Sequence, residues 1–350
     1  MQRNILFLYS ELAGYLFACL NHWSELGHKA TVIHWPVNPE APFDLPEITN
    51  IQFIERSKIQ TTKHLVSFIK KSEYDLILCS GWIDKGYIKA LSKGNFDCPR
   101  VLLMDTRWSG SIKQKLARPM LTSLLRRSFE FAWVAGKGQA DYAQKLGFGA
   151  KAIRTGFYVA DTARFSAVEQ KRRDRTDPIE HALIYLGRYV AHKGINDLWQ
   201  AFIGAKKNHP RSDWKLICVG TGEEFDNRIE HPDIEHLGFV QPDKLVEILQ
   251  RASVFVLPSH YEPWGVVVHE LASSGFPMIL SDEVGSAELF LEEGLNGFGF
   301  KAGDKEELQT KLEKVFQLSN ERIREMGDHS YSLSQKLSAQ TWTETLLELL

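Results

Sequence analysis

The 350-residue sequence predicts an α/β protein made of two doubly wound parallel sheets in tandem. Three observations support this prediction. The length suits two domains of roughly 170 residues, each large enough to bury its own core. Short apolar and β-branched runs alternate with longer amphipathic segments, which is the rhythm of βαβ units. A polar stretch at residues 156–181 interrupts this rhythm and separates two such series.

The first series predicts a domain over residues 1–160. Its expected strands are short runs rich in Val, Ile, Leu and Phe, with helical patterns between them. These strands are residues 4–9, 30–35, 74–80, 100–105 and 129–136. Strands that alternate with helices in this way form a parallel sheet.

The polar stretch 156–181 includes Pro178, and we interpret it as the connection between the domains. The second series predicts a domain over residues 161–335, with strands expected at 181–187, 214–220, 233–239, 252–259 and 276–280. A final helix at 336–350 carries apolar residues at helical spacing and could pack back on the N-terminal domain. Ligands of open parallel sheets bind beyond the carboxyl ends of the strands, so we expect the two sheets to face a cleft that holds the site.

The composition is that of a globular protein, with 43% hydrophobic and 25% charged residues. No apolar run reaches the roughly 18 residues that a membrane-spanning helix needs, and the first residues lack the pattern of a secretory signal. The four cysteines form no CxxC pair, and Cys79 and Cys218 lie in apolar runs where reduced, buried thiols are expected. These features predict a cytoplasmic protein.

The net charge of −2 hides an asymmetry between the two halves. Residues 1–170 hold 22 basic and 15 acidic residues, whereas the remainder holds 20 and 29. A basic half indicates either an anionic partner or simply an unequal solvated surface. We expect no nucleic-acid partner.

The basic character concentrates in residues 107–127. No acidic residue occurs from Thr106 to Phe129, and six cations alternate there with apolar residues. The pattern predicts an amphipathic helical region, interrupted at Pro119, of the kind that lies on an anionic membrane surface. The alternative is a helix that packs its apolar face on the sheet and leaves its cations in water.

Two cations follow the first expected strand of the second series. Arg188 and Lys193 lie in GRYVAHKG, a loop that should open into a helix from Ile195. A bidentate guanidinium and a compact ammonium beside a helix N-terminus suit a diphosphate. After the next strand, VGTG places Gly220 and Gly222 where the backbone passes close to another group or merely turns tightly. Neither GxGxxG nor GxxxxGK[ST] is present.

The segment VFVLPSHYEPWGVVVHELASSGFP carries two glutamates eight positions apart. Glu262 lies in the loop after a strand, and Glu270 lies in a helix expected from about Trp264 to Ser274. A carboxylate can accept hydrogen bonds from the vicinal hydroxyls of a sugar or a ribose. A helical Glu is more often a solvated residue, but the apolar neighbours of Glu270 favour burial.

These pieces together resemble glycosyltransferase family 4, whose members have the GT-B fold. The resemblance rests on GR followed by KG, then VGTG, then LPSHYEPWGVVVHELASSGFP with its E-x7-E spacing, then VGSAELFLEEGLNGFGF, and it covers residues 183–303. It implies that Arg188 and Lys193 hold the donor diphosphate and offset the charge of the leaving group. It also implies that Glu262 contacts the transferred sugar and that Glu270 holds the ribose.

The same resemblance implies further donor-binding positions. Ser286 and Ala287 would present backbone N–H groups to the phosphates, and Phe239 and Val240 would line the base pocket. The full set of these additional positions is Gly220, Gly222, Phe239, Val240, Gly265, Gly285, Ser286, Ala287 and Glu288.

The function implied is that of a retaining glycosyltransferase. It would move a sugar from a nucleotide-sugar to a glycan or lipid-linked saccharide, as in cell-surface polysaccharide or glycolipid synthesis. The family needs no metal, and the sequence has no DxD; we expect no cofactor beyond the nucleotide-sugar co-substrate. The alternatives are another GT-B enzyme, such as a sugar-nucleotide epimerase or a phosphorylase, and a non-catalytic nucleotide-binding module.

The first half matches the family less well. It offers only Gly14 where members often carry a Gly-Gly pair, and Asp105 stands near the position of a family His beside the reacting sugar. Asp105 could therefore act on the acceptor side, or it could simply cap a turn. Trp82 and Trp108 follow expected strands and could stack on acceptor sugar rings or pack in the protein.

Overall fold

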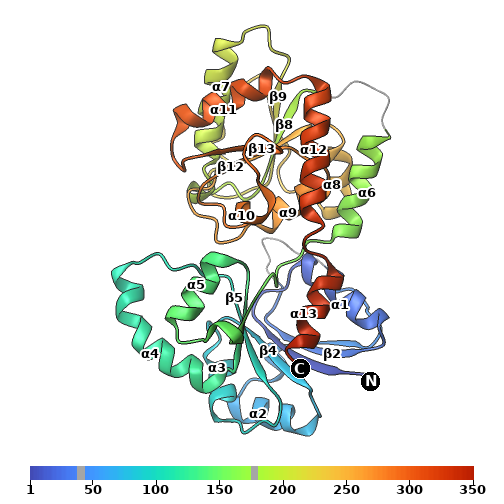
Figure 1. The fold of residues 1–350 in the computed structure, drawn as a ribbon, viewed down its shortest axis with the longest axis vertical. Coiled ribbons are helices and arrows are strands. Elements are labelled where there is room, and N and C mark those ends of the chain that lie inside the picture. Colours follow the sequence, from blue (N-terminus) through green and yellow to red (C-terminus); the bar gives the residue numbers. More distant parts are fainter. Residues whose placement is uncertain (38–43, 175–179) are drawn as a thin grey trace. The chain divides into compact units, whose positions relative to one another are not determined.

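The computed structural model describes residues 1–37, 44–174 and 180–350. The chain divides into two compact units, Met1–Asp161 together with Leu337–Leu350, and Thr162–Lys336 (Figure 1). The chain therefore crosses between the units twice, after Asp161 and after Lys336. Within the described part of the chain, no helix has both the length and the apolar character needed to cross a membrane.

The N-terminal unit contains a seven-stranded parallel sheet in the order β3-β2-β1-β4-β5-β6-β7. Its strands are β1 (Asn4–Tyr9), β2 (Lys29–His34), β3 (Ile51–Glu55), β4 (Leu76–Ser80), β5 (Arg100–Met104), β6 (Phe131–Val134) and β7 (Ile153–Thr155). Its helices and 3₁₀ turns are α1 (Gly14–Glu25), η1 (Arg56–Lys58), α2 (Thr62–Lys71), α3 (Lys85–Lys93), α4 (Ile112–Ser128), α5 (Lys137–Lys145), η2 (Ala150–Ala152) and α13 (Ala339–Glu348).

The central strands of this sheet are apolar along their whole length because helices cover both faces. In β1, residues Ile5–Leu8 have no exposed surface, and β4 is buried from Leu76 to Cys79. The order in which the chain adds strands to the sheet switches from one side to the other between the neighbouring strands β1 and β4. Open α/β sheets bind ligands at the carboxyl edge beside such a switch point.

The last helix, α13, belongs to the N-terminal unit and packs against α1 (Figure 1). Trp342 is buried, and its ring centroid lies 6.1 Å from that of Phe7 and 5.3 Å from that of Trp133. Ser338 and Thr341 form a capping box at the start of the helix, which satisfies backbone donors that would otherwise lack partners. The C-terminal segment thus completes the core of the N-terminal unit.

The C-terminal unit contains a six-stranded parallel sheet in the order β10-β9-β8-β11-β12-β13. Its strands are β8 (Ala182–Leu186), β9 (Lys215–Val219), β10 (Ile234–His236), β11 (Val254–Leu257), β12 (Met278–Ser281) and β13 (Gly297–Phe300). Its helices and 3₁₀ turn are α6 (Thr162–Arg173), η3 (Ala191–Lys193), α7 (Ile195–Asn208), α8 (Pro242–Leu249), α9 (Val266–Ser273), α10 (Ala287–Phe290), α11 (Lys305–Phe316) and α12 (Asn320–Ser334).

Residues 156–181, interpreted from the sequence as the connection between the domains, contain the boundary after Asp161 and the first helix of the C-terminal unit. Residues 162–173 form helix α6, which packs against α9 and α12, while Pro178 lies outside the described residues. The helix buries only Phe165, Val168 and Glu169, so its apolar pattern is too sparse to detect. Polar contacts also hold the helix. The Arg172 guanidinium lies 3.8 Å from the centroid of the Phe276 ring and donates to the Ala252 carbonyl, and Arg173 pairs with Asp328 at 3.2 Å.

The expected interruption at Pro119 is absent. Helix α4 runs unbroken from Ile112 to Ser128 with Pro119 inside it. Proline removes one backbone N–H and so deprives the carbonyl of Lys115, one turn earlier, of its helical partner. Because Pro119 and Lys115 are exposed, water can satisfy that carbonyl.

Candidate functional site

The strongest candidate site lies at the carboxyl edge of the C-terminal sheet. Strand order reverses between β8 and β11, and open α/β sheets bind ligands at the carboxyl edge beside such a switch point. Arg188 and Lys193 follow β8, and Glu262 follows β11. The topology therefore brings together three residues that were predicted from strand ends alone.

Close backbone contact holds these two loops together. Gly194, at φ 68°, is the N-cap residue of α7, and a Cβ atom there would lie 2.0 Å from the carbonyl oxygen of Pro258. The carbonyl of His192 accepts hydrogen bonds from the N–H groups of His260 at 2.8 Å and Tyr261 at 3.3 Å. Only glycine fits position 194, because both its backbone conformation and its contact exclude a side chain.

Lys193 and Glu262 form an ion pair, with the Lys193 Nζ donating to Glu262 Oε2. The two side chains are only 17% and 11% exposed. A buried charge is tolerated when it is paired, and here each residue neutralises the other. Two groups predicted to contact different parts of a donor thus contact each other.

Positive charge dominates the remainder of this loop. The Arg188 side chain is exposed, while the Tyr185 hydroxyl donates to the Arg188 backbone carbonyl at 2.7 Å and holds the chain from which it projects. Burial, followed by the positive charges of Lys193 and Arg188, lowers the pKa of the His192 imidazole. A neutral imidazole beside two cations leaves a net positive site for an anion.

The loop that carries Glu262 is tied to the loop after β12. Glu262 donates its N–H to the Glu283 carbonyl at 3.3 Å and accepts from the Gly285 N–H at 3.0 Å. A Cβ atom at Gly285 would lie 2.1 Å from the Pro263 carbonyl oxygen, so the two loops touch through their backbones. This attachment fixes the direction in which Glu262 points.

The Ser286 and Ala287 amides, which were expected to face the donor phosphates, both donate to backbone carbonyls of the protein. Ser286 donates its N–H to the Trp264 carbonyl at 2.9 Å, and Ala287 donates to the Val284 carbonyl at 3.2 Å. Both donors are thus used within the protein, because the one-turn helix α10 starts from a tight turn that bonds back on itself. The Ser286 hydroxyl donates to the Gly265 carbonyl at 3.0 Å, and Glu288 is exposed.

Gly220 and Gly222 bring the loops after β8 and β9 together. A Cβ atom at Gly220 would lie 1.9 Å from the Gly187 carbonyl oxygen, and one at Gly222 would lie 2.4 Å from that of Tyr189. Their φ angles are 135° and 153°. Of the two interpretations that the sequence left open, the close approach is the observed one, and the neighbour is protein backbone.

The remaining donor-side predictions occupy the rim of the same edge. Gly265, at φ 87°, precedes α9, and Glu270 lies half-buried within that helix. Phe239 and Val240 follow β10, and the Phe239 side chain is 46% exposed. An exposed aromatic ring at a strand end offers a flat apolar face to a ligand.

In the N-terminal unit, Gly14 and Asp105 both lie at the carboxyl edge of the sheet. Gly14 is the exposed first residue of α1, and a Cβ atom there would meet nothing within 4 Å. Asp105 directly follows β5 and is exposed. Its Oδ2 accepts a hydrogen bond from the Tyr158 hydroxyl at 3.1 Å, and its backbone carbonyl accepts from the Gln139 side chain at 3.0 Å.

Trp82 and Trp108 pack against the same residue of α5. Their ring centroids lie 6.4 Å and 5.4 Å from that of Tyr142, and Lys145 lies 5.8 Å from the centroid of the Trp108 ring. Both tryptophans are partly buried against the core of the unit. Packing therefore accounts for a large part of each ring, and only the remaining surface is available for an acceptor.

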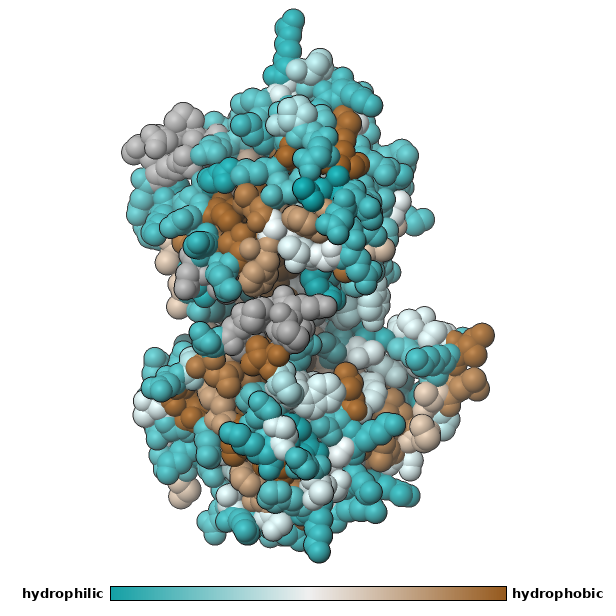
Figure 2. Space-filling model, turned by 180° about the vertical axis from the view of Figure 1, so that it is seen from behind, coloured by the Kyte–Doolittle hydropathy of each residue, from teal (hydrophilic) through white to brown (hydrophobic). Residues whose placement is uncertain are grey.

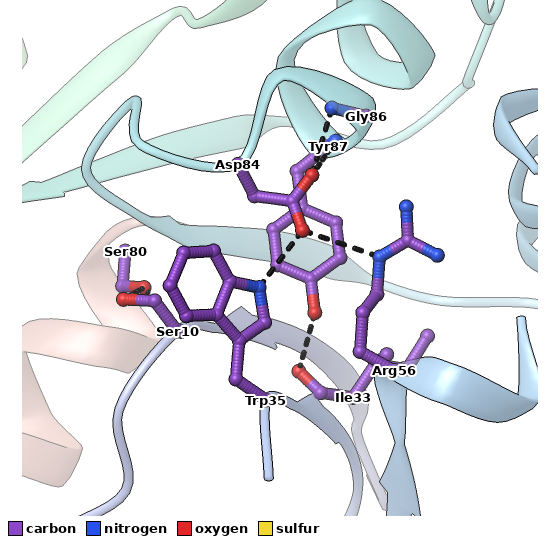
Figure 3. Close-up of polar contacts among 8 residues, drawn as sticks. All are labelled: Ser10, Ile33, Trp35, Arg56, Ser80, Asp84, Gly86 and Tyr87. Carbon is purple, nitrogen blue, oxygen red and sulfur yellow. Dashed lines mark hydrogen bonds and ion pairs between the residues drawn. The ribbon is translucent and has the colours of Figure 1, made fainter. Parts of the chain in front are cut away.

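Sequence reasoning missed a polar cluster at this edge (Figure 3). Asp84 Oδ1 caps α3 by accepting from the N–H groups of Gly86 and Tyr87, while Oδ2 accepts from Trp35 Nε1 at 2.9 Å and from Arg56 Nε at 3.3 Å. Burial acts to raise the pKa of the Asp84 carboxyl, but these hydrogen bonds and the Arg56 charge together lower it. A position shortly after a strand end is the signal from which this cluster could have been predicted, and it is shared by Trp35, Arg56 and Asp84.

The described residues contain no group of three or more His, Cys, Asp or Glu side chains that could hold a metal ion.

A comparison with protein families concerns the C-terminal unit. Residues 168–331 match the family of glycosyl transferases group 1. The match extends from α6 into α12, so it spans nearly all of this unit and includes Lys193, Glu262 and Glu270.

Curated proteins that resemble parts of the chain include one from each of two bacteria. Glycogen synthase of Mycobacterium tuberculosis (strain CDC 1551 / Oshkosh) is 34% identical over 122 residues, which are 33% of this chain and 29% of that protein. The lipopolysaccharide core biosynthesis glycosyltransferase LpsE of Rhizobium meliloti (strain 1021) is 27% identical over 218 residues, 61% of this chain and 62% of LpsE. In both cases the matched part of the chain spans less than two thirds of the relative.

Solved structures extend the likeness to the whole chain. The crystal structure of Anabaena Alr3699/HepE in complex with UDP and glucose matches with a TM-score of 0.72 at 16% identity, covering 99% of both chains. At this identity the likeness shows the fold alone. It confirms the predicted fold class, two Rossmann-like parallel-sheet units of the GT-B type.

Proposed function

We propose that the protein is a retaining glycosyltransferase of family 4 that moves a sugar from a nucleotide-sugar to a glycan or lipid-linked saccharide. The observation that carries the proposal is the meeting of Arg188, Lys193 and Glu262 beyond the carboxyl ends of β8 and β11. The group 1 match over the same residues supports it. Two cations and a carboxylate suit a ligand that has both a diphosphate and sugar hydroxyls.

In this proposal the bond between the sugar C1 and the diphosphate oxygen breaks, and the acceptor hydroxyl attacks C1 from the same face. Negative charge grows on the departing nucleoside diphosphate. The exposed Arg188 and the ammonium of Lys193 stabilise that charge, which lowers the barrier without a covalent enzyme intermediate. The proton of the acceptor hydroxyl passes to the departing phosphate oxygen.

Donor binding would exchange the partners of the Lys193–Glu262 ion pair. The diphosphate attracts the Lys193 ammonium, and sugar hydroxyls donate to the Glu262 carboxylate in its place. The half-buried Glu270 then accepts from the ribose hydroxyls, and Phe239 faces the base. The free protein thereby keeps both charges paired until a donor arrives.

The acceptor side and the setting complete the proposal. Asp105, Gly14 and the accessible surfaces of Trp82 and Trp108 are proposed to meet the acceptor at the N-terminal carboxyl edge. Catalysis is proposed to need no metal, so turnover should survive a chelator. The four free cysteines, three of them buried, favour a reducing cytoplasm.

The test is a transfer assay with a panel of nucleotide-sugars, which begins with UDP-glucose because the HepE structure holds UDP and glucose. We expect transfer with one donor, an unchanged anomeric configuration in the product, and full activity in EDTA. Lys193→Ala should depress turnover, and Glu270→Ala should mainly weaken donor binding. Donor epimerisation without transfer would support an epimerase, and binding without any turnover would support a nucleotide-binding module; either result rejects the transferase.

A further inference from the structure

Helix α4 of the N-terminal unit exposes apolar side chains that a globular protein normally buries. Ile112, Leu116, Met120 and Leu124 recur every four residues and are 76%, 77%, 73% and 38% exposed. This spacing places them on one face of the helix. Figure 2 shows apolar atoms gathered at the right-hand projecting edge of the N-terminal unit, over α4.

The opposite side of α4 already supplies the contact with the core. Leu125 and Ser128 are buried, and Leu121 packs against the core. The exposed residues are therefore additional to those that fold the helix onto the protein. This excludes the alternative from the sequence, in which the apolar face would lie on the sheet and only the cations would meet water.

The charged side chains of α4 all have one sign. No acidic residue occurs from Thr106 to Phe129. Five exposed cations lie on the helix, and the guanidinium of one of them, Arg126, lies 5.0 Å from the centroid of the Phe148 ring. These exposed cations are Lys113, Lys115, Arg118, Arg126 and Arg127.

We propose that this face of α4 docks on an anionic lipid bilayer, with the helix lying in the plane of the interface. The apolar residues enter the boundary of the acyl chains, and the cations contact lipid headgroups. A second copy of the chain fits less well because two such faces would bring like charges together. With 17 residues, the helix is about 25 Å long, which suits an in-plane anchor of several apolar residues.

The lipid contact does not depend on the proposed transfer reaction. If the acceptor is lipid-linked, docking through α4 would hold the N-terminal unit beside it. The two proposals therefore have separate measurements, vesicle binding for the surface and sugar transfer to a water-soluble acceptor for the active site.

The first experiment sediments the full-length protein with vesicles. One set contains phosphatidylcholine alone, and the other contains about one third phosphatidylglycerol. We expect binding to the anionic set at low salt, and much weaker binding at high salt or on neutral lipid, because salt screens the headgroup attraction.

Two variant pairs then test the face itself. Leu116→Ser with Met120→Ser should weaken vesicle partition about tenfold or more, since each loses apolar surface from the lipid. Leu26→Ser with Leu295→Ser is the matched control, because these residues are 52% and 51% exposed elsewhere on the protein. The control should bind as the wild type does.

The cations are tested in the same way. Lys113→Gln with Lys115→Gln should weaken binding to anionic vesicles about 25-fold, from about fivefold per charge. The exposed pair Lys70→Gln with Lys71→Gln on α2 is the control and should change it little. Vesicles should also slow amide hydrogen exchange within α4 of the wild type and leave α2 unaffected.

Several results would overturn the proposal. The first is a wild type that fails to bind anionic vesicles at low salt, and the second is an equal loss of vesicle binding by the target and control variants. The third such result is a wild type that sediments as a dimer which Leu116→Ser with Met120→Ser dissociates. Each variant should keep its melting temperature and its transfer to a soluble acceptor, because every substituted residue is exposed. If the wild type transferred no sugar to a soluble acceptor, that result would count against the proposed active site and not against the lipid contact.

Discussion

Replacing Lys193 by Ala should destabilise the C-terminal unit as well as impair the proposed reaction. The substitution leaves the Glu262 carboxylate, only 11% exposed, without the cation that balances it. Breaking a fully buried pair costs about 3–5 kcal/mol, and partial exposure of both side chains reduces this to about 2 kcal/mol. For a unit of this size, that corresponds to a fall of about 4–8 °C in the melting temperature.

The double variant Lys193→Met with Glu262→Gln separates the ion pair from the size of the side chains. It removes both charges and keeps similar volumes, so it should recover at least half of the lost stability while remaining inactive. Urea unfolding of the wild type, of Lys193→Met, of Glu262→Gln and of the double variant gives the coupling energy between the two side chains. A coupling energy near zero would refute the conclusion that the pair stabilises the ligand-free site.

Three further predictions concern backbone, capping and packing. Gly194→Ala should lower the free energy of unfolding by more than about 2 kcal/mol, because it adds a clash with Pro258 to an unfavourable φ. The control Gly303→Ala, at φ 79° with open space around it, should lower it by about 1 kcal/mol. Equal losses in the two variants would contradict the contact between Gly194 and Pro258. Asp84→Ala should lose about 1–2 kcal/mol at pH 7 in urea unfolding. Because the folded-state pKa of Asp84 is lowered, its stabilisation is present above its usual value of 3.8 and disappears as the pH falls below it, so wild type and variant should converge in acid. Trp342→Ala should destabilise the N-terminal unit by about 3–5 kcal/mol, and an unchanged melting curve would contradict its place in that core.

The fold was largely predictable because most strands are buried on both faces. Every expected apolar run contains a strand, from β1 at Asn4–Tyr9 to β12 at Met278–Ser281. The strands that were not predicted are β3, β7 and β13, which lie at the sheet edges or pack loosely enough to keep partly exposed residues. Edge strands lose the continuous apolar run that marks a central parallel strand.

The candidate site was predictable only where position after a strand was sufficient. Arg188, Lys193 and Glu262 follow strands that the topology places side by side. The ion pair between Lys193 and Glu262 joins residues 69 positions apart, and no spacing rule reports such a contact. The Ser286 and Ala287 amides bond within the protein because of a turn geometry that a motif does not specify.

The exposed apolar face of α4 could also not be predicted from the sequence alone. The sequence showed cations and apolar residues alternating, but helical spacing alone did not say which face met the core. Leu125 and Leu121 take that place in the structure, and Leu116 and Met120 do not. Which face of α4 is buried is determined by the packing of the whole N-terminal unit.

The central claim is that the carboxyl edge of the C-terminal sheet, beside β8 and β11, binds a nucleotide-sugar through Arg188 and Lys193. Calorimetric titration of nucleoside diphosphates and their sugars into the full-length protein tests it most directly. The account predicts that at least one such donor binds, and that Arg188→Ala weakens its binding about tenfold or more through the loss of charge-assisted hydrogen bonds to phosphate. Absence of binding by every donor, or equal binding by the wild type and Arg188→Ala, would contradict it.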